Sequence, residues 1–264
     1  MTSPVLAPVE FYPPLVNPAS PGLYGAVNWI ENPGPARFLA DGVRVRQVGN
    51  YGGSSAFGVW GADWCSPPGS DESEIKDGVR PDEADPFIPI TVWAYDECDA
   101  TPASRSEVLT RVQQILRLEE QTAVETSFAA QLLADAVGIT ATAETLAEAV
   151  GYLEGEMAKT NTTGQLHVSP ALATPLAQEA WIVNPGGTSP RSVLGHRFVF
   201  GGGYVDGLGD VIVASSPTFG WRDEVQVRPV LEQQSNVYAA IAERSVVVGY
   251  ERVVAAVQIT GSSV

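Results

Sequence analysis

One uninterrupted amphipathic segment, running from Ser104 to about Ala136, constrains the fold of this chain most strongly. Apolar residues recur along it at roughly helical spacing, and neither proline nor glycine follows Ser104 before Gly138, so it predicts a single helix of about 30 residues. Such a helix is about 45 Å long at 1.5 Å per residue, which is too long for the core of one small domain. We therefore expect a long helix along which the other elements pack. Its apolar positions are Val108, Val112, Ile115, Leu116, Ala123 and Phe128.

Two polar features of this segment carry further expectations. Ser104 and Glu107 have the spacing of a capping box, so we expect the helix to begin at Ser104. Glu119, Glu120 and Glu125 form a carboxylate cluster farther along, and we expect them on the solvated face of the helix rather than in a reactive site.

The totals of the chain exclude several classes of protein. Its 264 residues allow one large or two modest domains, and a hydrophobic content of 44% is compatible with a folded core. The net charge of −16 argues against tight binding to nucleic acid or to an anionic membrane, because both require a basic surface. No run of 18 apolar residues predicts a membrane span, and residues 1–4 lack the basic start of a signal peptide, so we expect folding in the cytoplasm.

The first 35 residues predict an extended arm. They contain eight prolines, which fix φ and cannot donate to a β-ladder. They also contain large apolar side chains, including Phe11, Tyr12, Tyr24 and Trp29, which a simple linker would not carry. We expect these residues to dock along the chain's own domain or along a neighbouring copy.

A β-hairpin is predicted next. Residues 42–48 and 56–60 alternate apolar and other side chains on either side of a turn signal at 49–55, which contains three glycines. Arg44 and Arg46 then share one face, because side chains alternate along a strand. A two-stranded ribbon is marginal alone and needs a surface to lie on.

Residues 66–85 are polar and acidic, and two interpretations remain open for them. A solvated loop is the simpler one. The alternative is an acidic strip that meets the Arg44 and Arg46 face of another copy.

The rest of the sequence alternates helices and strands, which makes the fold class α+β. We predict a strand at 87–95, a helix at 143–158 with an apolar stripe at every third or fourth residue, a strand at 166–168, and a third helix capped by Ser169 and bent or broken at Pro175. The later strands are predicted at 198–200, 211–213, 225–227, 237–241, 246–248 and 253–259.

Nothing in the sequence has the pattern of a catalytic, metal or cofactor site. There is no phosphate-binding loop, nucleophile elbow or zinc-protease motif, and we expect no cofactor. Residues 201–207 are glycine-rich but lack dinucleotide-binding spacing, so we expect an ordinary loop with positive φ angles. His167 is predicted to be a packed, hydrogen-bonded residue and His196 a turn residue. Cys65 and Cys98 have no metal-binding spacing and are expected to be inert thiols, with a late disulfide as the alternative.

Taken in order, these elements resemble the tailed-bacteriophage major capsid proteins of the Hong Kong 97-type fold, which encapsulin shell proteins share. The local stretches that resemble the family are 89–95 entering the long helix, 164–172, 194–204 and the closing strands at 238–259. The resemblance implies an N-terminal arm at 1–35, an extended loop with its connection at 36–90, a peripheral domain at 91–139 and 236–264, and an axial domain at 140–235.

It further implies a shell protein that assembles with itself into pentamers and hexamers and encloses double-stranded DNA without binding it specifically. A separate scaffolding protein, a portal and in some cases a decoration protein would be its partners, and no membrane is involved. The implied location is the virion capsid, after assembly in the host cytoplasm. Candidate contacts between subunits are Phe11, Tyr12, Tyr24, Trp29, Arg44, Arg46, Tyr51, Phe57 and Trp60.

Some members of the family weld their shells through a lysine-to-asparagine bond, but the predicted hairpin contains no lysine. Lys76 lies outside it and Lys159 follows the second helix, so we expect no such cross-link from the hairpin. Three alternatives stay open: an encapsulin-like compartment holding a cargo enzyme, a decoration or tail structural protein, and an acidic hydrolase.

Overall fold

The computed structural model describes residues 11–19, 22–30, 39–52, 56–61, 76–80, 82–178 and 189–261. The predicted long helix is confirmed as α2, which spans Pro102–Asp135 and has 34 residues. Its start was predicted wrongly. Thr101 is the N-cap, its side chain accepts a hydrogen bond from the Ser104 backbone, and Pro102 occupies the first turn, where no N–H partner is needed.

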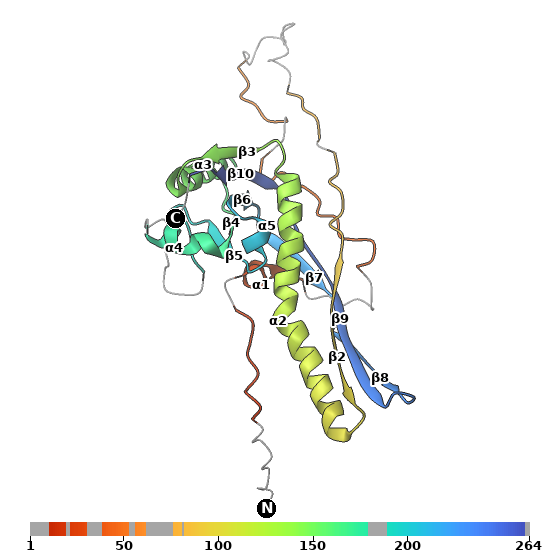
Figure 1. Cartoon of the computed structure of the whole chain (residues 1–264). Coiled ribbons are helices and arrows are strands. Elements are labelled where there is room, and N and C mark those ends of the chain that lie inside the picture. The colour runs from red at the N-terminus through yellow and green to blue at the C-terminus, as the bar shows by residue number, and fades with distance from the viewer. Residues whose placement is uncertain are drawn as a thin grey trace, which may run out of the picture.

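The first sheet lies along α2. Its path is β1 (Asn28–Trp29), β7 (Thr218–Arg222), β9 (Val237–Tyr250) and β2 (Ile90–Asp99), and β8 (Gln226–Glu232) also pairs with β9. β2 and β9 are antiparallel over the whole of β2, from Ile90 opposite Val246 to Asp99 opposite Val237. Together with α2 and β8 they form the elongated lower part of the molecule in Figure 1.

The second sheet has the order β3 (Thr140–Ala143), β10 (Val253–Ile259), β6 (Val211–Ser215), β4 (Gln165–Val168) and β5 (Arg197–Phe200). It packs against α3 (Leu146–Lys159), and the short helices η2 (Pro170–Leu172) and α4 (Ala173–Gln178) follow β4. The apolar stripe predicted for α3 is confirmed, because Leu146, Val150, Leu153 and Met157 are all buried. The capping box of the chain also lies here, between Thr145 and Glu148.

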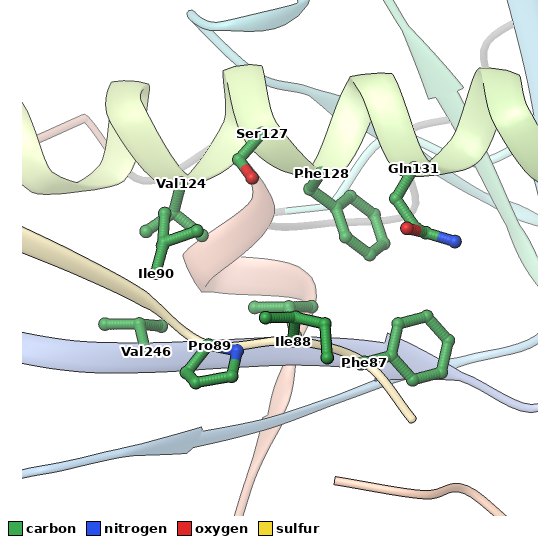
Figure 2. Close-up of a pocket in the computed structure, with 10 residues that line it drawn as sticks. Phe87, Ile88, Pro89, Ile90, Val124, Ser127, Phe128, Gln131 and Val246 are labelled. Atoms are coloured by element: carbon green, nitrogen blue, oxygen red, sulfur yellow. The ribbon is translucent and has the colours of Figure 1, made fainter. Parts of the chain in front are cut away.

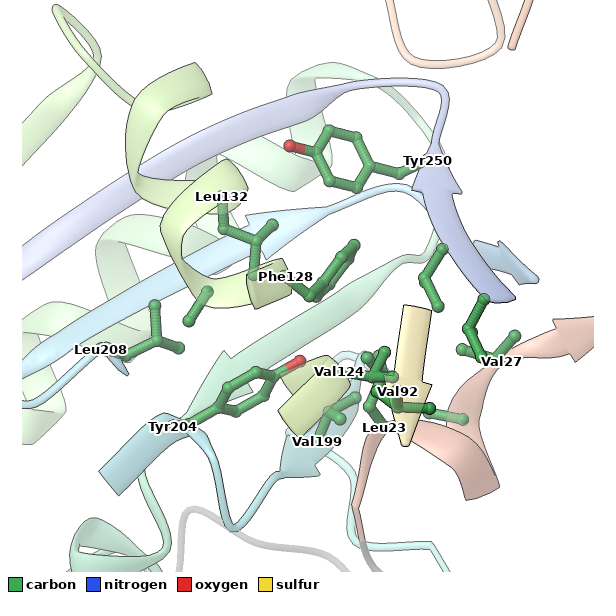
Figure 3. Packing of buried hydrophobic residues seen from close by; sticks show 14 of the residues in the cluster. Leu23, Val27, Val92, Val124, Phe128, Leu132, Val199, Tyr204, Leu208 and Tyr250 are labelled. Atoms are coloured by element: carbon green, nitrogen blue, oxygen red, sulfur yellow. The ribbon is translucent and has the colours of Figure 1, made fainter. Parts of the chain in front are cut away.

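Two apolar cores correspond to the two sheets. The first lies between α2 and the β2–β9 sheet and extends to the short helices α1 (Leu23–Ala26) and α5 (Tyr204–Gly207). Figure 3 shows Phe128 and Leu132 of α2 close to Tyr204 and Tyr250, and the Phe128 and Tyr250 rings meet edge to face at 5.6 Å. The second core is formed by α3, α4 and the inner side chains of the second sheet.

Several boundaries differ from the predictions. The strands expected at 237–241 and 246–248 are one strand, β9, because the polar residues 243–245 continue the ladder. Pro175 does not break α4, since it stands in the first turn of that helix. β3 and β7 were not predicted, because both are short and neither has a long apolar run.

The two sheets draw strands from interleaved parts of the chain. β10 pairs with β3 and β6 in the second sheet, although it follows β9 of the first. β7 and β8 pair with β9 in the first sheet, although they follow β6 of the second. The reason is a sharp return after Tyr250, which sends the end of the chain from one sheet into the other.

Candidate assembly surfaces

An excursion between residues 43 and 87 projects from one end of the molecule, at the top of Figure 1. Its two ends are joined by an antiparallel bridge, in which Val43 and Phe87 exchange N–H···O bonds of 2.9 Å. The pairing predicted inside it is wrong: residues 44–48 and 57–61 belong to no strand among the described residues. Instead Gly78 approaches Ala56 so closely that a Cβ on Gly78 would lie 2.3 Å from the Ala56 Cα, so the outgoing leg lies beside the return leg.

The outgoing leg, residues 56–61, presents apolar side chains to solvent. Phe57 is 88% exposed and Val59 is 91% exposed. Trp60 is partly covered by Lys76 of the return leg, whose ammonium lies 4.4 Å from the centre of the indole ring. Exposed aromatic and β-branched side chains on a projection with no core of its own are typical of a surface that another molecule covers.

The base of the excursion is tied to the body of the same chain. The Tyr51 hydroxyl donates to the Thr163 carbonyl at 2.9 Å, and burial raises the pKa of this phenol. Glu251 accepts from the Val48 and Asn50 backbones and from the Asn50 side-chain amide. Tyr51 is therefore an anchor within the chain rather than an exposed contact.

Arg44 and Arg46 also find a partner within their own chain. Glu83 lies 3.0 Å from Arg44 and 3.6 Å from Arg46. Within one molecule, Glu83 of the acidic stretch at 66–85 thus already pairs with these two arginines. All three side chains are exposed, and such pairs contribute little free energy, at most about 1 kcal/mol.

The first described part of the arm, residues 11–19, runs in the opposite direction to the excursion, toward the bottom of Figure 1. Phe11 and Tyr12 of this segment are exposed. The arm touches the N-terminal half of α2, where Gln114 donates to the Val16 carbonyl and Arg117 donates to Asn17.

The second described part of the arm, residues 22–30, docks on its own chain. The Tyr24 hydroxyl donates to Glu120 of α2. Arg244 of β9 donates two hydrogen bonds, of 2.7 and 2.8 Å, to the same carboxylate. Burial, and then the charge of Glu120, raise the pKa of Tyr24. Trp29 donates to the Tyr24 carbonyl and meets its ring edge to face at 4.8 Å. Tyr24 and Trp29 thus belong largely to the chain's own core.

Glu125 joins three separate segments inside the protein. Its side chain is completely buried and accepts hydrogen bonds from the backbone N–H of Leu23 at 2.7 Å, from that of Gly203 at 3.0 Å and from the Gln121 side chain at 2.9 Å. Glu120 and Glu125 were both expected to be solvated, and both expectations are wrong, since their partners lie far away in the sequence.

The glycine-rich loop at 201–207 packs against the Glu125 carboxylate. Its glycines at 201 to 203 do not have positive φ angles, contrary to the expectation. A Cβ on Gly201 would lie 2.7 Å from the Glu125 carboxyl carbon, and one on Gly203 would lie 2.5 Å from backbone atoms of α2. Glycine is required here because the loop backbone must approach α2 closely.

His167 is a packed, hydrogen-bonded residue, as predicted. Ser215 donates to the Ser216 carbonyl, so it accepts from Nε2–H of His167, and Nδ1 of His167 then accepts from the Tyr204 hydroxyl at 3.0 Å. All members of this chain of bonds are buried, and burial lowers the pKa of His167 to about 3. The arrangement of serine and histidine is therefore sealed from any substrate and has a structural role.

No protein-family model and no curated protein matches the sequence. The mature capsid of bacteriophage PhiM1 matches in structure with a TM-score of 0.57 at 12% identity, covering 98% of this chain and 92% of its own. The capsid of an empty GTA particle gives 0.58 at 10% identity, covering 98% and 96%. The holo-SrpI encapsulin complex from Synechococcus elongatus gives 0.54 at 10% identity, covering 96% and 92%.

The chain has the Hong Kong 97-type fold. The resemblance deduced from the order of elements is confirmed at the level of the fold, with α2 as the long helix and with the arm and excursion as projections. The likeness extends over nearly the whole chain, so no large part of it is left for an unrelated domain.

The Hong Kong 97-type core here also has a surface that the sequence analysis missed. On β2, Val92 and Ala94 face α2, while Trp93 and Tyr95 point to the opposite side and are 67% and 45% exposed. Ile241 of β9 lies directly opposite Tyr95 and is exposed too. The signal was present, because β2 is apolar on both faces, which predicts that both are covered.

One pocket lies between the start of β2 and α2. Figure 2 shows an apolar slot of about 160 Å³ between residues 87–90 and α2, with Val124 and Phe128 on the helix side. It holds no titratable side chain and has room for little more than one side chain. Among the described residues, no group of three or more histidine, cysteine, aspartate or glutamate side chains is placed to hold a metal ion.

The structure also places the second histidine and one of the two cysteines. His196 is buried, and its Nδ1 accepts from the Gly164 backbone at 3.2 Å. Cys98 is a free, exposed thiol, and Cys65 lies outside the described residues. No helix in the described parts of the chain is both long and apolar enough to cross a membrane.

Proposed function

We propose that this chain is the major capsid protein of a tailed phage, which assembles into pentamers and hexamers of an icosahedral head around double-stranded DNA. One observation carries the proposal: a chain with this fold over nearly its whole length leaves apolar side chains exposed on two projections that point in opposite directions. A projection without a core of its own gains its stabilisation by burying those side chains on other copies.

Electrostatics supports the packaging of DNA without adhesion. The net charge of −16 repels the phosphate backbone, and counterions screen this repulsion over about 10 Å at 0.1 M salt. The chain would thus line a head without holding the DNA in place. A separate scaffolding protein, a portal and a decoration protein belong to the same proposal, as do assembly in the host cytoplasm and residence in the virion.

The role proposed is structural rather than enzymatic. The hydrolase alternative gains no support from the histidines, since His167 is sealed in the core and His196 is buried.

The first experiment is negative-stain microscopy of the purified protein over a range of concentrations. Closed icosahedral particles are expected, and a protein that stays monomeric throughout contradicts the proposal. Exchanging Phe57 and Val59 for serine is expected to prevent closure. Val137→Ser is the matched control, because Val137 is 80% exposed but lies on the body at the end of α2.

An encapsulin-like compartment is the second candidate, favoured by the structural likeness to the holo-SrpI encapsulin complex. The contents of particles purified from the natural source separate the two, since DNA supports the phage head and a co-purifying enzyme supports the compartment. A decoration protein would fail to assemble alone.

We also predict a shell without covalent links between chains. Lys76 lies over Trp60 at 4.4 Å, on the return leg of the excursion, and the outgoing leg has no lysine. Boiled particles are expected to run as one band of 27.9 kDa on a denaturing gel. A ladder of higher bands that maps to the excursion would contradict the prediction.

A further inference from the structure

A pocket of about 460 Å³ lies where the arm meets α2 and the first sheet. The arm contributes Pro18 and Tyr24 to its wall, and the rest of the wall comes from α2, the end of β7, the start of β8 and β9. This volume is within the range of about 300–1,000 Å³ that is usual for sites that bind small molecules. All of these segments belong to one chain, so the pocket does not need a second copy to be complete.

The side chains that line this pocket carry an excess of positive charge. Three arginines line it, Arg117 of α2, Arg222 of β7 and Arg244 of β9, against one carboxylate, that of Glu120. The whole chain has 15 lysines and arginines against 31 acidic residues, so three cations around one pocket run against its overall charge. The lining residues alone sum to a charge of +2, which favours an anionic occupant.

Glu120 does not neutralise this excess. Arg244 donates two hydrogen bonds to its carboxylate, and the Tyr24 hydroxyl donates a third. Glu120 and Arg244 therefore form a pair whose charges cancel. Arg117 donates instead to the side-chain oxygen of Asn17, which is uncharged.

Arg222 lies close to the same end of the pocket. Its guanidinium carbon stands over the Trp29 ring, 4.4 Å from the ring centre. Burial raises the pKa of Tyr24, whereas the charges of Arg244 and Arg222 both oppose this rise, so both cations lie near the Tyr24 hydroxyl. A guanidinium that stacks on a ring keeps its N–H groups in its own plane, where they can still donate to a ligand.

The rest of the lining is in part apolar. Leu116 of α2, Val225 after β7 and Val227 of β8 all face the pocket. Leu116 is buried, while Val225 remains 41% exposed. A ligand that covers these side chains gains hydrophobic stabilisation in addition to its contact with the arginines.

We propose that this pocket binds a small organic oxyanion, a carboxylate or a phosphate ester that carries an apolar body. The planar donor fork of arginine matches the geometry of both oxyanions, and the valines and leucine suit the body. The inference goes beyond the proposed shell function and does not depend on it. Because Pro18 and Tyr24 belong to the wall, a bound ligand would also hold the arm on α2.

Calorimetric titration of the dissociated full chain tests the proposal with four probes. Phenyl phosphate and benzoate carry the two oxyanions on an apolar ring, benzyl alcohol has the ring without the charge, and inorganic phosphate has the charge without the ring. At least one aromatic anion is expected to bind about tenfold more tightly than both controls, and which one is tighter separates phosphate from carboxylate. Equal binding of inorganic phosphate would mean an adventitious ion only. No binding of either aromatic anion at about 10 mM would equally overturn the proposal.

Two variants locate the binding. Arg117→Gln and Arg222→Gln are each expected to weaken it by about tenfold, because each removes a charged donor. Arg111→Gln is the matched control, since Arg111 is an exposed arginine of the same helix that does not line the pocket. Losses no greater than that of the control would place the ligand elsewhere.

A nuclear magnetic resonance spectrum of the valine methyl groups gives a readout that does not use the arginines. The tighter probe is expected to shift the Val225 and Val227 signals and to leave that of Val137, which lies at the end of α2, in place. Binding that leaves the first two signals unmoved contradicts the assignment of this pocket.

Discussion

The buried carboxylate of Glu125 offers the sharpest test of how the arm and the glycine-rich loop are held on α2. Replacing it with alanine leaves the Leu23 and Gly203 N–H groups buried without an acceptor. Each unsatisfied group costs about 1–3 kcal/mol, so the free energy of unfolding should fall by about 3–5 kcal/mol in total. Glu125→Gln should cost less, because its carbonyl oxygen still accepts one of the two bonds.

The assay is urea unfolding of the dissociated chain, followed by circular dichroism. Glu119→Ala is the matched control, because Glu119 lies on the same helix but is exposed, and its loss should change the free energy of unfolding by about 0.5 kcal/mol or less. If Glu125→Ala is no more destabilising than Glu119→Ala, the argument that this carboxylate joins the three segments is refuted.

Three further predictions use the same unfolding assay. The pKa of His167 is about 3 in the folded chain, below the ordinary 6.5, so the unfolded state binds the proton more readily. The free energy of unfolding should therefore fall by about 1.4 kcal/mol per pH unit as the pH drops from 6.5 toward 3. A His167→Gln variant with the same pH slope as the wild type would contradict this. Gly203→Ala should lower the free energy of unfolding by about 2 kcal/mol or more, because the added Cβ meets α2. Gly155→Ala, in open space on α3, should raise it by about 0.5–1 kcal/mol. Equal effects of the two variants would contradict the close approach of Gly203 to α2. Arg244→Met should cost about 3–5 kcal/mol, since it leaves the buried Glu120 without its cation, and a loss below about 1 kcal/mol would mean that the pair is not buried as described.

Local patterns predicted the helices well. The stripe on α3 is buried throughout, and α2 is unbroken as predicted. On α2, four of the six predicted apolar positions are buried, whereas Ile115 and Ala123 are exposed. The order of elements was likewise enough to indicate the fold, because a long helix between an extended arm and a mixed α/β half is an unusual combination.

Long-range partners were the features that the sequence could not supply. Glu120 and Glu125 have the same local pattern as the exposed Glu119. Their partners distinguish them: Tyr24 and Arg244 for Glu120, and Leu23 and Gly203 for Glu125, all of them distant in the sequence. A buried charge with remote partners leaves no periodic signal.

The prediction of a hairpin in the excursion was wrong for a related reason. The alternation in residues 42–48 and 56–60 was a true strand signal, but a strand pattern does not say which segment it pairs with. Val43 pairs with Phe87 instead, and the outgoing leg runs beside the return leg. Its apolar side chains Phe57 and Val59 are left exposed in the single chain.

A cryo-electron microscopy map of the assembled particle is the most direct test of the central claim. The account predicts a closed shell in which a neighbouring copy covers Phe57 and Val59 of each excursion and Phe11 and Tyr12 of each arm. A map in which both projections fold back onto their own chain, or in which these four side chains still face solvent, would contradict it.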